Sequence, residues 1–212
     1  MVSLKGVLLK NMNQEEIEKR LWYNLKEWNL RKPMKWNNQF NIIYADPPWT
    51  FKNYNNEKST HNADHHYPCM NMEDIKKIPV ADLASENCIL FMWCTDPLLN
   101  QQIEVLTAWG FQYKTVAFYW VKENKNQSNM RFWKGPGYWT RANPEICLLA
   151  TKGSPKRVGT NVDRLVIAER DVHSRKPPII RNKIVELCGD LPRIELFART
   201  TQEGWLSWGN EI

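Results

Sequence analysis

The stretch "FNIIYADPPWTF" covers residues 40–51 and decides the fold. Its first six residues are an apolar run of strand length, and two consecutive prolines stop that strand directly after Asp46. An ordinary turn needs only one proline or glycine. This turn instead holds an acid, two rigid backbone segments and an indole at the end of a strand. The stretch therefore predicts a buried strand that ends in a rigid polar site.

The turn has the groups needed to hold a planar amine. The Asp46 carboxylate and the backbone carbonyls of Asp46 and Pro47 accept hydrogen bonds, and the proline rings fix where those carbonyls point. An amino group on a ring, such as that of adenine, offers two hydrogens to two such acceptors. Trp49 is then expected to stack on the ring, which contributes about 1–3 kcal/mol per base. The alternative is a plain Pro-Pro turn with a core tryptophan.

Apolar runs alternate with helical patterns along the chain. Strands are predicted at 40–45, 88–94, 113–121, 145–151, 164–169 and 193–198. Helices are predicted at 14–30, 71–78, 80–85, 97–110 and 177–189. Strands that are apolar on both faces, alternating with helices, predict an α/β domain with a largely parallel sheet. Because ligands bind outside the carboxyl ends of such strands, Asp46 and Glu195 are expected to face one cleft.

Length, charge and cysteine use limit the class of protein. The 212 residues suit one globular domain at 40–212, preceded by an amphipathic helix and linker at 1–39. A net charge of +6 favours a polyanionic partner such as nucleic acid, although a mildly basic protein without one remains the alternative. The five cysteines form no CxxC pair, which indicates free thiols in a reducing compartment. The start of the chain has no apolar stretch of signal or membrane length, so a cytoplasmic protein is predicted.

Further motifs follow the "DPPW" turn in a specific order. They are "HYPCM", "LFMWCTDPLL", "AWGFQYKTVAFYWVK", "GYWTRANPEICLLATKG", "HSRKP", "IELFAR" and "WGNEI". In order and spacing, residues 40–212 resemble the DPPW-type adenine-N6 methyltransferases, the family that includes the catalytic subunit of the messenger-RNA adenosine methyltransferase. Compact bacterial and phage members resemble the chain most. The resemblance implies a Rossmann-like methyltransferase fold with permuted motif order, S-adenosyl-L-methionine as cofactor, and adenine in nucleic acid as substrate, with DNA favoured over RNA.

The resemblance also implies roles for individual residues. The residues that match the target-amine motif are Asp46, Pro47, Pro48 and Trp49. The residues implied to bind the cofactor are Asp46, Lys176, Glu195, Arg199, Thr201 and Asn210. Within this set, Lys176 matches the lysine near the methionine carboxylate and Glu195 the acid at the ribose. Tyr67 and Glu145 match family residues at the substrate. The sequence departs from the eukaryotic pattern at Ala198, Thr201, Gln202 and Glu211.

A basic, aromatic segment at 122–142 suits a groove that follows a nucleic-acid strand. The substrate-binding residues expected there are Arg131, Trp133, Lys134, Trp139 and Arg141. The alternative is a solvated loop over core aromatic residues. His61, His65 and His66 with Cys69 match no standard zinc spacing, so no metal is expected.

Two functions from different classes remain open at this point. The first is an active adenine-N6 methyltransferase, which the intact "DPPW" motif with Lys176, Glu195 and Asn210 favours. The second is a catalytically silent nucleic-acid-binding subunit that supports an active methyltransferase partner. The resemblance allows a homodimer or a heterodimer with a related subunit. No membrane partner is expected.

Overall fold

A computed structural model describes most of the chain from the first strand onward. The described residues are 40–50, 69–125, 131–171, 175–209 and 212. The helix predicted at 14–30, Tyr67, Asn210 and His61, His65 and His66 lie outside them. The strands are β1 (Phe40–Ala45), β2 (Ala84–Cys94), β3 (Gln112–Glu123), β4 (Glu145–Lys152), β5 (Leu165–Glu169), β6 (Arg193–Leu196) and β7 (Leu206–Trp208). The helices are α3 (Met72–Lys76), α4 (Leu99–Ala108) and α5 (Ile179–Cys188), with short 3₁₀ turns η3 (Val80–Asp82) and η4 (Asp96–Leu98).

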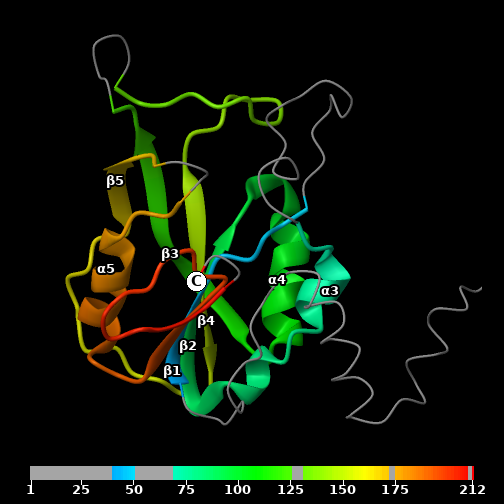
Figure 1. Cartoon of the computed structure of the whole chain (residues 1–212), viewed down its shortest axis with the longest axis vertical. Helices are drawn as coiled ribbons and strands as arrows, with labels where there is room; N and C mark the ends of the chain where they lie inside the picture. Colours follow the sequence, from blue (N-terminus) through cyan, green and yellow to red (C-terminus); the bar gives the residue numbers. More distant parts are fainter. Residues whose placement is uncertain (1–39, 51–68, 126–130, 172–174, 210–211) are drawn as a thin grey trace, which may run out of the picture.

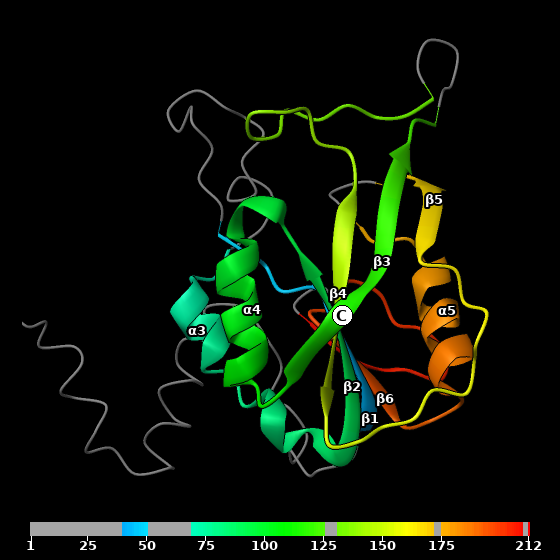
Figure 2. The same ribbon diagram turned by 180° about the vertical axis from the view of Figure 1, so that it is seen from behind.

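The strands form one seven-stranded sheet in the order β5-β3-β4-β2-β1-β6-β7. Neighbouring strands are parallel except where β4 pairs with β2 and β3, so β4 is the one strand of this sheet that runs the opposite way. The prediction of an α/β domain with a largely parallel sheet is confirmed. Figure 1 shows the curled sheet between its helices, and Figure 2 shows the same arrangement from behind.

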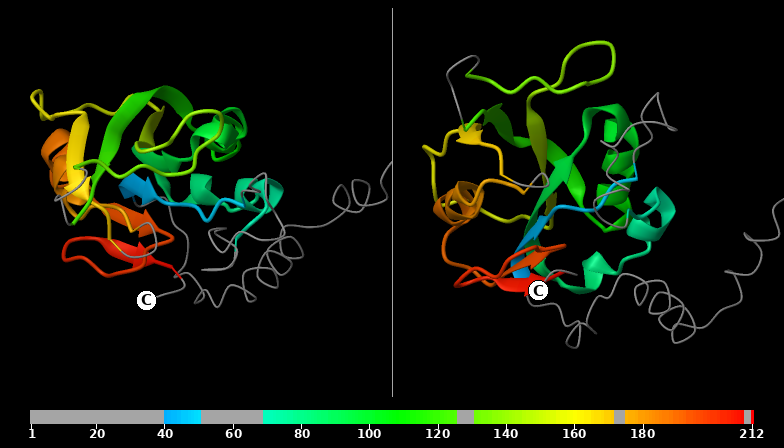
Figure 3. Two further views of the ribbon diagram at one scale, coloured as in Figure 1. Left: turned by 90° about the horizontal axis from the view of Figure 1, so that it is seen from above. Right: turned by 45° about the horizontal axis from the view of Figure 1, so that its top comes forward.

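Each face of the sheet packs against its own helices. Helices α3 and α4 lie on one side and α5 lies on the other, as the views in Figure 3 also show. Strand β1 contributes to both cores by alternation: Ile43 packs into the cluster that contains the α4 residue Leu106, and Ile42 packs into the cluster that contains the α5 residue Ile184. Burial on both faces explains why β1 reads as a continuous apolar run.

Two segments differ from the sequence-based predictions. The helix predicted at 80–85 is a 3₁₀ turn at Val80–Asp82, because β2 already begins at Ala84, which pairs with Phe40 of β1. Strand β7 was not predicted, since it has only three residues and one neighbour, β6. The remaining predicted strands and helices of the described region are present, with boundaries that shift by a few residues.

The strand directions bring several segments to one edge of the sheet. Asp46 follows the carboxyl end of β1, and β2, β3 and β6 also end at this edge. Because β4 is reversed, its first residue, Glu145, lies there too. The segment that joins β3 to β4 therefore leaves and returns at the edge that holds Asp46. Residues 131–144 of this segment run across the top of Figure 1.

Candidate active site

Asp46 is held in place by both the backbone and a lysine. Its backbone N–H donates to the carbonyl of Leu196 in β6 over 3.4 Å, which connects the turn to the neighbouring strand. Lys176 Nζ donates to both carboxylate oxygens of Asp46, over 2.9 and 2.7 Å. The two residues are 130 positions apart in the sequence. Two of the sequence-predicted residues thus meet at one point, at the start of the segment that leads into α5.

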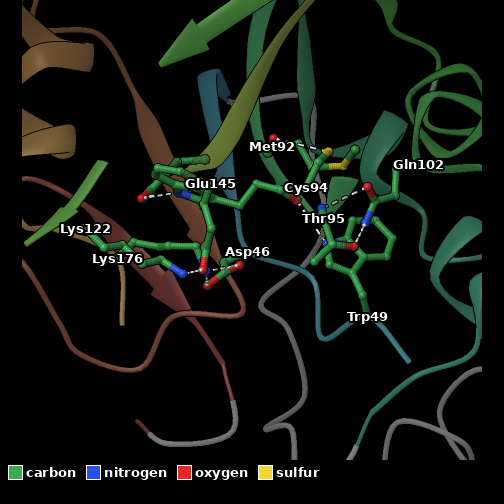
Figure 4. A network of polar contacts seen from close by, with 11 residues as sticks. Asp46, Trp49, Met92, Cys94, Thr95, Gln102, Lys122, Glu145 and Lys176 are labelled. Atoms are coloured by element: carbon green, nitrogen blue, oxygen red, sulfur yellow. Dashed lines mark hydrogen bonds and ion pairs between the residues drawn. The ribbon is translucent and has the colours of Figure 1, made fainter. Parts of the chain in front are cut away.

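Glu145 connects this pair to a second lysine. One of its oxygens lies 3.3 Å from Lys176 Nζ, and the other lies 2.5 Å from Lys122 Nζ in β3. The two lysine side chains are only 12% and 13% exposed. Burial raises the pKa of Glu145, but the two ammonium groups outweigh it and lower that pKa from 4.5 to about 2. Figure 4 shows the resulting network of Asp46, Lys176, Glu145 and Lys122 with alternating charges.

Hydrogen bonds on both sides hold the Pro-Pro turn in position. The Pro47 carbonyl accepts from the Trp49 amide over 2.9 Å, and the Pro48 carbonyl accepts from the Met70 amide over 2.9 Å. The Trp49 indole is 6% exposed in the core and donates to the carbonyl of Trp93 over 3.0 Å. The core-tryptophan alternative therefore describes where this indole lies. Stacking of Trp49 on a base remains a prediction that requires the ring to become accessible.

Glu195 lies in β6 beside β1, where it is paired with Tyr44 in the strand register. Both of its oxygens accept from Arg181 of α5, over 2.6 and 2.8 Å. The carboxylate is 6% exposed as a residue, and burial raises its pKa against the lowering effect of Arg181. The charge of Asp46 adds a smaller raising effect on the pKa of Glu195. A single cleft that both acids face stays a prediction.

Arg181 was not predicted as a functional residue, although the sequence contains a signal for it. It lies three and seven residues before Ile184 and Cys188, so it shares a face of α5 with these two buried residues. A charged residue on the apolar stripe of a helix requires a buried partner. In this chain Glu195 is that partner.

The donors and acceptors at this edge fit S-adenosylmethionine. That molecule has an amino-acid carboxylate, which suits the Lys176 ammonium, and a ribose diol, which suits the carboxylate of Glu195. Each Glu195 oxygen has a second acceptor position beyond its bond to Arg181. The hydroxyl of Ser207, which is paired with Glu195 in the strand register, is buried and has no hydrogen-bond partner among the residues that the structure describes. Such an orphaned group next to a buried acid is consistent with a ligand site.

The segment after β6 contains the other expected cofactor residues. Arg199 is partly buried and Thr201 is exposed, both directly beyond the end of the strand. Between them and Glu195, Phe197 has a positive φ of 62°, a strained conformation for a bulky residue. Strain of this kind gathers at functional sites.

An asparagine clamps the base of the β3–β4 segment. Asn143 Oδ1 accepts from the Lys122 amide over 2.8 Å, and Asn143 Nδ2 donates to the Lys122 carbonyl over 2.9 Å. Asn143 Nδ2 also donates to the carbonyl of Trp133. The clamp was not predicted. It connects this segment to Lys122 and so to the Asp46 network.

Within the same segment the expected substrate residues lie in different surroundings. The Trp133 ring has Lys122 Nζ 5.2 Å and the Arg170 guanidinium 5.0 Å from its centroid, so cations already contact its π-system. Arg131 forms an ion pair with Glu123 over 2.7 Å. The residues of this set that are exposed to solvent are Arg131, Lys134, Trp139 and Arg141.

Comparison with known proteins finds relatives over the whole described domain. The MT-A70 family model matches residues 40–211. The type II methyltransferase M.MunI of Mycoplasma sp is 34% identical over 191 residues, which are 82% of this chain and 78% of that protein. A probable N(6)-adenosine-methyltransferase MT-A70-like protein of Oryza sativa subsp. japonica is 29% identical over 203 residues, 94% of this chain and 26% of that protein. The N(6)-adenine-specific methyltransferase METTL4 of Mus musculus is 28% identical over 190 residues, 82% of this chain and 37% of that protein.

Proposed function

The chain belongs to the MT-A70 family of methyltransferases, and from that premise we propose that it transfers a methyl group from S-adenosylmethionine to the N6 amino group of adenine in DNA. The observation that carries the proposal is the joining of Asp46, Lys176 and Glu145 in one partly buried network at the carboxyl end of β1. DNA is proposed over RNA because of the resemblance to compact bacterial members of the family, and the bacterial relative of which the chain spans 78% is a type II methyltransferase.

The cofactor residues follow from the chemistry of the site. MT-A70 methyltransferases generally depend on S-adenosylmethionine, which supplies a methyl group bound to a positively charged sulfur. Lys176 is proposed to hold its carboxylate, and Glu195 is proposed to accept from its ribose hydroxyls. Arg199, Thr201 and Asn210 complete the proposed cofactor set.

Asp46 is proposed to act on the amine of the target base. That nitrogen is a poor nucleophile because its lone pair is delocalised into the ring. When Asp46 and a carbonyl of the Asp46–Pro47 turn accept hydrogen bonds from the two N–H groups of the amine, they favour a pyramidal nitrogen with a localised lone pair. These hydrogen bonds stabilise the transition state more than the ground state. Correct alignment of the reacting groups contributes further, up to about 7–11 kcal/mol in the best cases.

The second candidate function is a silent subunit that binds nucleic acid beside an active partner. The intact network at Asp46 and the bidentate Arg181–Glu195 pair favour an active enzyme instead, because a silent subunit has no need to keep the acceptor for the amine. The proposed partner is nucleic acid, with Tyr67 and the exposed residues of the β3–β4 segment at the interface. A homodimer or a heterodimer with a related subunit remains a proposal. No helix among the residues that the structure describes is long and apolar enough to cross a bilayer.

A transfer assay tests the proposal. The protein is incubated with labelled S-adenosylmethionine and a panel of single- and double-stranded DNA and RNA, and the digested nucleosides are identified. We expect N6-methyladenine in DNA, its loss in Asp46→Ala, and its retention in Asp163→Ala, which changes an exposed acid in the β4–β5 connection. Cofactor binding without any transfer would favour the silent subunit. Absence of both would refute the proposed function.

A further inference from the structure

The conformation and exposure of Trp139 are unusual for a tryptophan. Its side chain is fully exposed, at 101%, and its backbone has a positive φ of 60°. A left-handed conformation is strained for a bulky residue, and an exposed indole leaves a large apolar surface in water. Packing against the described part of the chain explains neither feature. Strain combined with an exposed aromatic ring points to contact with a ligand.

The loop around Trp139 is built to hold this conformation. The Gly135 amide donates to the Ala142 carbonyl over 2.7 Å and closes the tip, and the Thr140 amide donates to the Tyr138 carbonyl over 2.6 Å. Gly137 has φ of 62°, and a Cβ there would lie 2.1 Å from the Thr140 carbonyl oxygen. Only glycine fits this position. The indole is therefore displayed by a defined turn.

The tip is connected to the edge of the sheet that holds Asp46. The Asn143 clamp fastens the base of the loop to Lys122, and Glu145, two residues further on, belongs to the Asp46 network. Figure 1 shows the segment 131–144 lying across this end of the molecule. The indole is therefore displayed on a segment whose base continues directly into the Asp46 network.

The charge of the loop identifies the kind of partner. Residues 131–144, "RFWKGPGYWTRANP", contain three basic residues and no acid. Lys134 and Arg141 are both exposed near the indole in the sequence. An apolar ring among cations matches a phosphate backbone with stacked bases better than it matches a protein surface.

We propose that Trp139 is a wedge that inserts into the base stack of duplex DNA when the target adenine leaves it. The proposal rests on the proposed function, because an enzyme that modifies a base amine in a duplex must first move that base out of the stack. Wedge side chains are commonly apolar and unstack a base step. The indole of Trp139 takes the place of the departed base and stacks on its former neighbours.

A comparison of duplex with single-stranded substrate distinguishes a wedge from a residue that only contributes to DNA binding. Unmethylated plasmid DNA is offered to the protein in native and in heat-denatured form. Trp139→Ala should slow methylation of the duplex about 5- to 150-fold more than methylation of the denatured strands, the factor that corresponds to the stacking of one base. Trp139→Phe should recover most of the rate on duplex, because it restores an aromatic face.

Phe132→Ala is the matched control in the same loop. Phe132 is also an exposed aromatic residue, but its ring faces the Arg131 guanidinium at 5.0 Å. Its loss should change the duplex-to-single-strand ratio less than threefold. An equal effect of Phe132→Ala would mean that the general apolar surface of the loop is responsible, and it would overturn the wedge.

A direct readout of base flipping completes the test. Once the methylated site has been mapped, 2-aminopurine replaces the target adenine, and its fluorescence rises when the base leaves the stack. Trp139→Ala should reduce this rise on a paired target. The Trp139→Ala variant should regain methylation activity when the target adenine is opposite a mismatched cytosine, since a mismatched base costs less free energy to flip. Unchanged fluorescence in Trp139→Ala would overturn the proposal.

The outcomes separate the wedge from the proposed function. If the wild type methylates DNA and Trp139→Ala loses duplex and single-strand activity equally, the wedge is wrong and the proposed function stands. The same holds if the wild type methylates only single strands. If Trp139→Ala instead turns a dimer into a monomer in sedimentation and leaves flipping intact, the loop is a protein interface. No methylation by the wild type refutes the proposed function itself.

Discussion

Glu145→Gln tests whether the carboxylate of Glu145 stabilises the folded protein by balancing the charges of Lys122 and Lys176. The exchange keeps the shape of the side chain and removes its charge. The fall of the Glu145 pKa from 4.5 to about 2 means that the folded protein stabilises the ionised form. At about 1.4 kcal/mol for each tenfold change, this corresponds to about 3 kcal/mol. Because Lys122 and Lys176 are largely buried, we expect Glu145→Gln to lower the free energy of unfolding at pH 7 by about that amount.

The pH dependence of the free energy of unfolding is a second test of the role of Glu145. The folded-state pKa of Glu145 lies below the unfolded value, so the stabilisation is fully present above about pH 4.5 and disappears as the pH falls through about 2. The difference between wild type and Glu145→Gln should therefore shrink from about 3 kcal/mol at pH 7 to about 1 kcal/mol at pH 3. Urea unfolding followed by tryptophan fluorescence at several pH values measures both quantities.

Glu73→Gln provides the matched control. Glu73 also forms an ion pair with a lysine, Lys76, over 3.0 Å, but its side chain is 72% exposed. Exposed pairs of this kind contribute about 0–1 kcal/mol. The reasoning is refuted if Glu145→Gln lowers the free energy of unfolding at pH 7 by less than about 1 kcal/mol, or if the loss is the same at pH 7 and pH 3. Either result would mean that the ionised Glu145 does not stabilise the two buried lysines.

Three further predictions concern the amine acceptor, the cofactor and the substrate. Asp46→Asn should slow methyl transfer about 100-fold with the Kd of S-adenosylmethionine changed only a few-fold, as measured by single-turnover kinetics and calorimetry; transfer at the wild-type rate would remove Asp46 from the mechanism. Glu195→Gln should weaken cofactor binding about 10- to 100-fold in calorimetry and also destabilise the fold, because it leaves Arg181 buried without its charge partner. The double variant Arg181→Met/Glu195→Gln should regain stability in urea but not affinity, and recovery of affinity as well would contradict a ribose-binding role. Lys134→Ala/Arg141→Ala should flatten the slope of log K against log salt for DNA by about 0.7–0.9 for each charge that contacts phosphate, and a slope equal to that of wild type would place the DNA elsewhere.

Local sequence patterns predicted much of the fold. The apolar run at 40–45 and the prolines that stop it identified β1 and the position of Asp46 at its end, because strand periodicity and the missing proline N–H act within a few residues. The reversed direction of β4 was not predicted. A buried strand reads as an apolar run whether it is parallel or antiparallel to its neighbours, so the pattern holds no information on direction.

The sequence by itself determined which chemical groups the site contains: an acid after a strand, a rigid Pro-Pro turn, and basic and acidic residues in recognisable motifs. Only the tertiary structure decided which of them meet. The contacts of Lys176 with Asp46 and Glu145 join residues far apart in the chain, and the Arg181–Glu195 pair joins a helix to a strand. The sequence also did not predict that Trp139 is exposed while the ring of Trp133 contacts cations. Both tryptophans lie in one segment and have similar neighbours along the chain. The physical reason is that charge interactions and burial depend on distances in space, whereas sequence patterns report only neighbours along the chain.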